Sequence, residues 1–126
     1  MVFLTHLAAV LDNWDPRVVD GIAAEHRVIT FDNRGVGASS GATPTTIEEM
    51  ARDAVTFIRA LGFDRVDLFG FSMGGMIAQV IAQEEPQLIR KLMLAGTGPA
   101  GGKGMKEVVW VAQLDTLRGL LTLQDP

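Results

Sequence analysis

Hydrophobic and polar positions along the chain follow two alternating patterns. Short apolar runs at residues 2–5, 27–31, 66–69 and 91–95 are typical of β-strands. Between them, residues 16–25, 47–61 and 73–84 carry apolar positions at spacings of three and four, which predicts helices. Alternating strands and helices indicate βαβ units. We therefore expect an α/β fold in three layers, with a mainly parallel sheet of about four strands and helices on both faces.

Local signals predict where two of these helices begin and end. Thr46 and Glu49 have capping-box spacing before residues 47–61, and Gly62 is a typical residue for the end of that helix. Residues 73–84 are apolar on most faces, and Pro86 cannot continue a helix. The sequence therefore predicts an amphipathic helix on the sheet, followed by a helix buried against a central strand.

The C-terminal part differs from the rest of the chain. Residues 95–104 are rich in glycine and predict a loop, and residues 103–126 show a helical pattern too apolar to be stable alone in water. The full length of 126 residues fits one domain. We therefore interpret residues 1–126 as a single domain, with the sheet and its helices in residues 1–102 and a C-terminal helical segment in residues 103–126.

Composition excludes several classes of function. The chain is 48% hydrophobic and 21% charged with a net charge of −4, so it has no basic footprint for nucleic acid or an anionic membrane. It has no long apolar run and no signal-peptide pattern at its start, and we expect a cytoplasmic protein. The chain has no cysteine, and its histidines and carboxylates do not have the spacing typical of a metal site. It also has no complete phosphate-loop pattern, so we expect neither a metal nor a cofactor.

The strongest chemical signal is a serine between two glycines. Gly70-Phe71-Ser72-Met73-Gly74 has the glycine-x-serine-x-glycine spacing of a nucleophile elbow, in which a sharp turn from strand to helix exposes the serine. A predicted strand precedes this motif and a predicted helix follows it. Glycines at these positions remove side chains that would collide with the strand and the helix. Ser72 is therefore the candidate nucleophile.

Several segments in order resemble the α/β-hydrolase family. "VFLTHL" is similar to the strand and oxyanion loop of that family, "VITFDNRGVGASSG" to its next strand and turn, "TIEEMARDAVTFIRALGF" to the following helix, "VDLFGFSMGG" to the nucleophile elbow and "KLMLAGTGP" to the next strand. The form "GFSMGG" resembles small esterases and cofactor-free perhydrolases or haloperoxidases. The resemblance implies a truncated α/β-hydrolase core, with residues 27–31, 2–5, 66–69 and 91–95 in that order across the sheet and residues 103–126 at the start of a lid.

The same resemblance implies roles for individual residues. Ser72 would be the nucleophile, and the backbone N–H groups of Ala8 and Met73 would form the oxyanion hole. The acid and histidine of the family come after the lid, so the resemblance places them beyond Pro126, and it places the first two strands before Met1. Loss of the base typically lowers the rate by several orders of magnitude.

Two residues near the expected site could replace the missing base and acid. His6 follows its strand and belongs at the same end of the sheet as Ser72, where it is either a base or a structural part of the oxyanion loop. Asp32 also follows a strand at that end and could orient His6, although "FDNRGVG" fits better a loop held by Asp32 and Arg34. His26 precedes its strand and belongs at the opposite end.

Two functions therefore remain open. One is a serine hydrolase that cleaves small carboxylic esters through an acyl-enzyme on Ser72. The other is a non-catalytic remnant that binds small molecules and associates with itself. Unpaired edges at residues 27–31 and 91–95, together with the apolar C-terminal segment, favour a homo-oligomer in either case.

Overall fold

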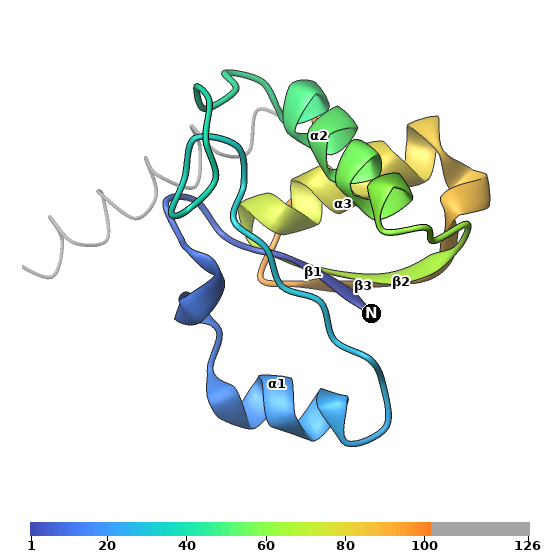
Figure 1. The fold of residues 1–126 in the computed structure, drawn as a ribbon. Coiled ribbons are helices and arrows are strands. Elements are labelled where there is room, and N and C mark those ends of the chain that lie inside the picture. Colours follow the sequence, from blue (N-terminus) through green and yellow to red (C-terminus); the bar gives the residue numbers. More distant parts are fainter. Residues whose placement is uncertain (102–126) are drawn as a thin grey trace, which may run out of the picture.

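A computed structural model describes residues 1–101. The predicted helical segment 103–126 lies outside these residues. In the described part, the elements follow in the order β1 (Val2–Leu4), η1 (Leu11–Asn13), α1 (Pro16–Ala23), α2 (Ile47–Ala60), β2 (Val66–Phe71), α3 (Met73–Glu84), η2 (Pro86–Leu88) and β3 (Ile89–Ala95). Figure 1 shows α2 and α3 on one face of the sheet and α1 on the other. The predicted three-layer α/β fold is confirmed.

The sheet is parallel with the strand order β1-β2-β3. Leu4 lies opposite Gly70, and Phe71 lies opposite Ala95, so the carboxyl ends of the three strands meet at one edge. This edge is on the left in Figure 1, and the N-terminus marks the opposite end. The predicted strand order is confirmed for these strands, and it places β2, the strand before Ser72, in the interior of the sheet.

The prediction of a fourth strand at residues 27–31 is wrong among the described residues. This segment runs beside β1 but forms only an isolated parallel bridge between Val2 and Ile29. Its hydrogen bonds are from Phe3 N–H to Ile29 C=O and from Ile29 N–H to Met1 C=O, both 2.9 Å. No backbone hydrogen bond joins residues 30–31 to β1, although Phe3 and Leu4 follow Val2 in that strand, so the pairing ends at Ile29. The apolar pattern predicted the place of the segment but not the length of its pairing.

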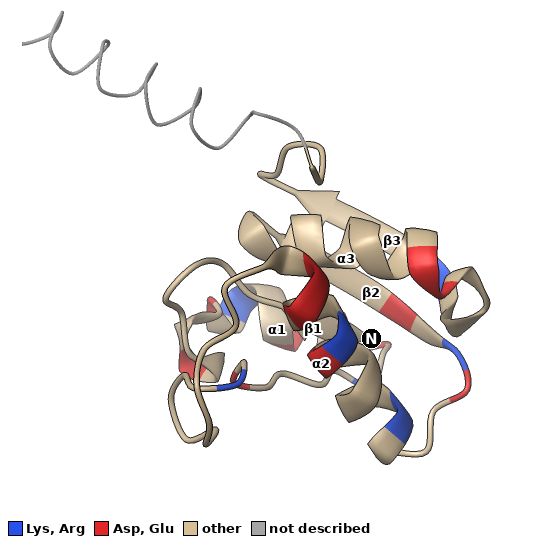
Figure 2. Cartoon of the chain, turned by 90° about the horizontal axis from the view of Figure 1, so that it is seen from above, with Lys and Arg blue, Asp and Glu red and all other residues tan. Residues whose placement is uncertain are grey.

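The main core lies between the sheet and α2 with α3. Its most buried side chains come from all of these elements: Val2, Leu4, Ala51, Ala54, Ile58, Leu68, Ile77, Ala78 and Ile81. The Thr46 hydroxyl accepts a hydrogen bond from the Glu49 N–H at 3.2 Å at the start of α2, as the capping pattern predicts. Figure 2 shows charged residues of both signs along α2, whose other side faces the core.

Aromatic side chains cover the opposite face of the sheet. Phe3 lies edge-on to Trp14 with 4.8 Å between ring centroids, and 4.9 Å from Phe69. Edge-to-face and tilted contacts of this kind each add about 0.5–1.5 kcal/mol beyond the burial of apolar area. The segment between β1 and α1 therefore packs against the face of β1 and β2 opposite the main core, near the carboxyl ends of the strands.

Candidate active site

Ser72 has a strained backbone at the junction of β2 and α3. Its φ is 54° and its ψ is −117°, and it is the residue directly before Met73, where α3 begins. A non-glycine residue held in such a region costs about 1–3 kcal/mol, which the surrounding structure must supply. Two hydrogen bonds hold it here: the Ser72 N–H donates to the Ala95 C=O at 3.0 Å, and the Thr97 hydroxyl donates to the Ser72 C=O at 2.6 Å.

The glycines around Ser72 allow backbone segments to approach closely. A Cβ on Gly70 would lie 2.6 Å from the Gly74 carbonyl oxygen. A Cβ on Gly74 would overlap the Leu4 carbonyl and lie 2.8 Å from the Thr5 carbonyl oxygen, and a Cβ on Gly75 would lie 2.5 Å from the Thr97 methyl carbon. All three contacts are shorter than side chains tolerate. The turn predicted from the spacing of the motif is therefore present, and α3 begins directly against β1.

Two backbone N–H groups at this end of the sheet have no hydrogen-bond partner among the described residues. The Met73 N–H belongs to the first turn of α3, where no partner exists within the helix. No hydrogen bond within residues 1–101 uses the Ala8 N–H, and Ala8 has a positive φ of 59°. Since Leu4 pairs with Gly70, the loop that contains Ala8 leaves the sheet at the same edge as Ser72. The dipole of α3 adds positive potential at this point.

His6 also lies at this edge. Its ring packs edge-on against Phe71, the residue before the serine, with 5.6 Å between centroids. Its Nδ1 lies 3.5 Å from the Thr5 hydroxyl, and its C=O accepts the Ala9 N–H at 3.3 Å. Within residues 1–101, no hydrogen bond joins His6 to Ser72 or to Asp32. The second histidine, His26, lines a hollow at the opposite edge.

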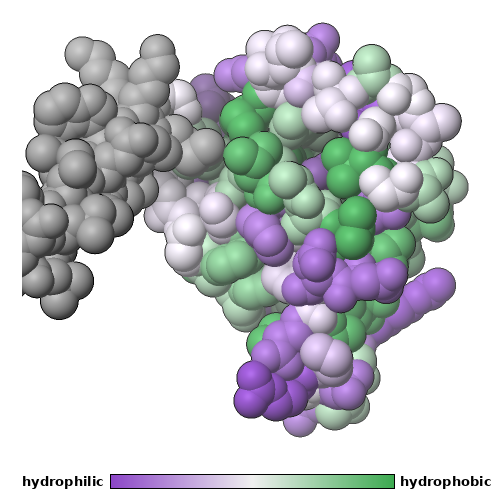
Figure 3. All heavy atoms as spheres, turned by 90° about the vertical axis from the view of Figure 1, so that its left-hand side faces the viewer, coloured by the Kyte–Doolittle hydropathy of each residue, from purple (hydrophilic) through white to green (hydrophobic). Residues whose placement is uncertain are grey.

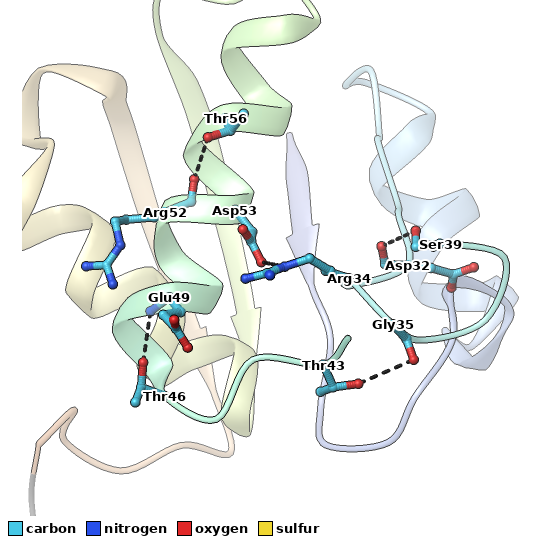
Figure 4. Close-up of polar contacts among 10 residues, drawn as sticks. All are labelled: Asp32, Arg34, Gly35, Ser39, Thr43, Thr46, Glu49, Arg52, Asp53 and Thr56. Carbon is cyan, nitrogen blue, oxygen red and sulfur yellow. Dashed lines mark hydrogen bonds and ion pairs between the residues drawn. The ribbon is translucent and has the colours of Figure 1, made fainter. Parts of the chain in front are cut away.

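Asp32 organises the loop that follows residues 27–31. Its carboxylate accepts the Leu11 N–H at 2.7 Å and the Ala38 N–H at 2.9 Å, one through each oxygen. A Cβ on Gly37, whose φ is 56°, would lie 2.5 Å from the Asp32 carboxyl carbon. Figure 4 shows the neighbouring contacts, in which the Ser39 hydroxyl donates to the Asp32 C=O and Arg34 Nε lies 2.7 Å from Asp53. These contacts support the interpretation of a loop held by Asp32 and Arg34.

Two residues that no sequence motif indicated fix the serine turn. Thr97 reaches the Ser72 C=O, and Gln79 of α3 bridges the helix to the loop after β3. The Gln79 amide donates to the Gly98 C=O at 2.8 Å and to the Gly75 C=O at 3.1 Å, and its oxygen accepts the Ala100 N–H at 3.1 Å. The available signal was a glutamine in the middle of an otherwise apolar helix, since a polar side chain that is partly removed from water needs partners.

The surface at this end combines apolar and polar side chains. Leu7 and Phe71 are 60% and 38% exposed, and both lie next to residues of the candidate site. Figure 3 shows this end of the molecule, where hydrophobic residues form several patches with hydrophilic residues between them. Within residues 1–101, no group of three or more His, Asp or Glu side chains could hold a metal ion, and no helix is long and apolar enough to cross a membrane. The site can therefore offer a hydroxyl, two N–H donors and apolar contacts.

Comparison with known proteins decides the family. The model of the alpha/beta hydrolase fold matches residues 1–120. The chain belongs to the α/β-hydrolase fold family. This confirms the resemblance found in the sequence, and the fold of the described residues agrees with it.

Two similar bacterial proteins are named as a hydrolase and a peroxidase. The chain is 39% identical over 83 residues to a putative carbamate hydrolase RutD of Rhizobium rhizogenes, an overlap of 64% of this chain and 31% of that protein. It is 35% identical over 98 residues to a putative non-heme bromoperoxidase BpoC of Mycobacterium tuberculosis, 77% of this chain and 37% of that protein. The chain thus spans about a third of the length of these α/β hydrolases.

Solved structures show the same relationship. An alpha/beta hydrolase fold protein from Chitinophaga pinensis superposes with a TM-score of 0.79 at 38% identity, over 99% of this chain and 43% of that chain. A marine microorganism esterase superposes with a TM-score of 0.77 at 26% identity, over 99% of this chain and 47% of that chain. This α/β hydrolase therefore matches a little under half of the length of each of these two structures.

Proposed function

We propose that this chain carries the nucleophile and oxyanion hole of a serine hydrolase that cleaves small carboxylic esters. The observation that carries the proposal is the strained backbone of Ser72 at the end of an interior strand, at the same end of the sheet as the Ala8 and Met73 N–H groups, which have no partner within residues 1–101. A structure stores strain of this kind where function needs a side chain in one exact place. The names of the similar proteins, among them a carbamate hydrolase and an esterase, support attack on a carbonyl carbon bonded to oxygen.

In the proposed reaction, the Ser72 hydroxyl oxygen attacks the ester carbonyl carbon and its proton passes to a base. The carbonyl oxygen becomes an oxyanion and accepts hydrogen bonds from the N–H groups of Met73 and Ala8. The C–O bond to the alcohol then breaks, the alcohol leaves with a proton from the base, and an acyl-enzyme remains on Ser72. Water hydrolyses this ester by the same steps and releases the carboxylic acid.

The base in this chain is the open part of the proposal. Among the described residues, His6 is the histidine at the end of the sheet that carries Ser72. Asp32 would be the acid that orients it. The hydrogen bonds that Asp32 makes to Leu11 and Ala38 favour a structural role for this carboxylate, so the pairing with His6 requires those bonds to be shared. Residues 102–126 contain no histidine, so any other histidine that serves this site would come from outside these 126 residues.

A fluorophosphonate probe tests the nucleophile directly, because it phosphonylates activated serines. We expect one adduct by intact mass on the 126-residue chain, no adduct on Ser72→Ala, and an unchanged adduct on Ser40→Ala, which removes another serine hydroxyl. Circular dichroism of each variant checks that it is folded. A folded chain without any Ser72 adduct would contradict the proposal and favour the non-catalytic alternative.

A separate pair of variants tests the base. If His6 is the base, His6→Ala lowers the rate of hydrolysis of an activated ester by several orders of magnitude, whereas His26→Ala at the opposite edge leaves it unchanged. Full esterase activity in His6→Ala, together with its loss in Ser72→Ala, would show that the base lies elsewhere.

The second candidate function is a self-associating, ligand-binding domain without catalysis. The observation that favours it is the exposure of β3, where Leu92, Met93 and Leu94 are 39%, 48% and 42% exposed on a strand at the edge of the three-stranded sheet. An exposed apolar edge strand is a site for pairing with another chain. Light scattering at micromolar concentration should then show a dimer or larger species, and a folded monomer would contradict association. A cytoplasmic location stays a prediction.

A further inference from the structure

A basic hollow lies at the end of the sheet opposite Ser72. It has a volume of about 200 Å³ and lies where the strands begin, near the N-terminus in Figure 1. Its charged and aromatic side chains come from three separate segments of the chain: His26, Arg27, Phe63, Arg65, Asp67 and Arg90. The side chains that give the hollow its charge are thus distant in sequence and meet only in the fold.

Each of the three arginines is held in place by a contact within the protein. Arg90 donates two hydrogen bonds to the Asp67 carboxylate, at 2.8 and 2.6 Å. Asp67 is 3% exposed, and its pKa lies below the ordinary value of 3.8, mainly because of the hydrogen bonds from Arg90. The Arg27 guanidinium lies over the Phe63 ring at 5.7 Å, and Arg65 Nη2 lies 3.5 Å from the Ile89 C=O.

These contacts leave the hollow with an excess of positive charge. Arg27 and Arg65 take part in no ion pair within residues 1–101, and Asp67 neutralises only Arg90. A guanidinium has five N–H donors, and each of these three arginines has several left over. The chain as a whole has a net charge of −4, so positive charge is concentrated here against the overall balance. Like charges that line one hollow repel one another unless an anion lies between them.

We propose that this hollow binds a phosphate group, as inorganic phosphate or as a phosphomonoester. Arginine guanidinium groups match phosphate oxygens in geometry and form charge-assisted, often bidentate hydrogen bonds with them. The volume of about 200 Å³ equals that of several water molecules at roughly 30 Å³ each, which is enough for a tetrahedral oxyanion and part of its hydration shell. The site is independent of the proposed hydrolase chemistry, since it lies at the amino ends of the strands, whereas Ser72 lies at their carboxyl ends.

Calorimetric titration of the intact chain with inorganic phosphate, against sodium chloride of equal ionic strength, tests the site. We expect saturable binding that weakens as salt rises, because the arginines are partly exposed. Arg27→Gln and Arg65→Gln should each weaken binding at least fivefold and together abolish it; neither substitution removes an ion pair. Arg52→Gln on α2 makes the same charge change away from the hollow and should leave binding unchanged.

The source of the phosphate group is distinguished by a second titration with phenyl phosphate. Tighter binding than inorganic phosphate supports a phosphomonoester whose organic group contacts Phe63, and equal or weaker binding supports inorganic phosphate. The proposal is overturned if folded wild-type protein gives no saturable binding at 10 mM phosphate. It is also overturned if the double variant binds as wild type does, or if Arg52→Gln weakens binding as much as the two hollow variants do.

Discussion

Substitution of Gly74 by alanine tests how closely the serine turn is packed. The new Cβ would overlap the Leu4 carbonyl and lie 2.8 Å from the Thr5 carbonyl oxygen, whereas ordinary C···O contacts are about 3.3 Å or longer. Both obstacles are backbone atoms of β1 and the residue after it, so no side chain can rotate away. Relief requires α3 to move from β1 across the main core, which opens gaps among Leu4, Leu68 and Ile77.

The expected loss of stability follows from two opposing terms. Overpacking typically costs 1–3 kcal/mol, and the rigid backbone on both sides puts this site at about 3 kcal/mol. Alanine regains about 1 kcal/mol over glycine in a helix. The net loss is therefore about 2 kcal/mol or more, which lowers the urea midpoint by about 1 M for a slope near 2 kcal/mol per molar.

Urea unfolding followed by far-ultraviolet circular dichroism measures this change, with Gly21→Ala as the control. A Cβ on Gly21 in α1 meets nothing within 4 Å, so the helix-propensity gain acts alone and the midpoint should rise slightly. The two glycine-to-alanine changes thus have opposite expected signs. A Gly74→Ala midpoint equal to or above that of wild type would refute the close-packing argument.

Three further predictions concern side-chain hydrogen bonds. Thr97→Val should slow fluorophosphonate labelling of Ser72 about fivefold because the 2.6 Å bond to the Ser72 C=O is lost, while Thr97→Ser retains the donor and the rate. Asp67→Asn should lower the free energy of unfolding by about 1 kcal/mol at pH 7. The loss is small because the partner Arg90 is largely exposed, and solvent screens the ion pair. The pKa of Asp67 in the folded state is below its ordinary value of 3.8. The stabilisation of the folded state by Asp67 is therefore full above 3.8 and is lost as pH falls through the folded pKa. The urea midpoints of wild type and Asp67→Asn should then converge in acid. Asp32→Asn should lower the free energy of unfolding by about 1 kcal/mol, because the amide nitrogen cannot accept the N–H of Leu11 or Ala38. Limited proteolysis should then cut faster within residues 32–41 than in wild type. Equal cutting rates would count against this role of Asp32.

Local sequence signals predicted much of the fold because their causes act over a few residues. Thr46 caps α2 by a bond to the Glu49 N–H three positions away, and Gly62 takes a positive φ of 81° directly after the helix. The range 73–84 predicted for the buried helix coincides with α3, since Ser72 and Pro86 limit it on each side. The segment at residues 27–31 was predicted less well, because an apolar run indicates burial beside the sheet but not how many residues pair with the neighbouring strand.

The sequence by itself determined the α/β class, the helix ends and the position of Ser72 in a turn between a strand and a helix, since periodicity, capping residues and glycine spacing are local properties of the chain. Only the tertiary structure decided which distant groups surround that turn. Thr97 and Gln79 reach it because β3 lies beside β2, and Asp32 meets the Leu11 N–H because its loop folds back over the segment after β1. Likewise, Arg27, Arg65 and Arg90 meet around one hollow because the starts of β2 and β3 are paired in parallel and the segment before Ile29 runs beside β1. Contacts of this kind depend on strand order and register, which residues far apart in sequence set jointly.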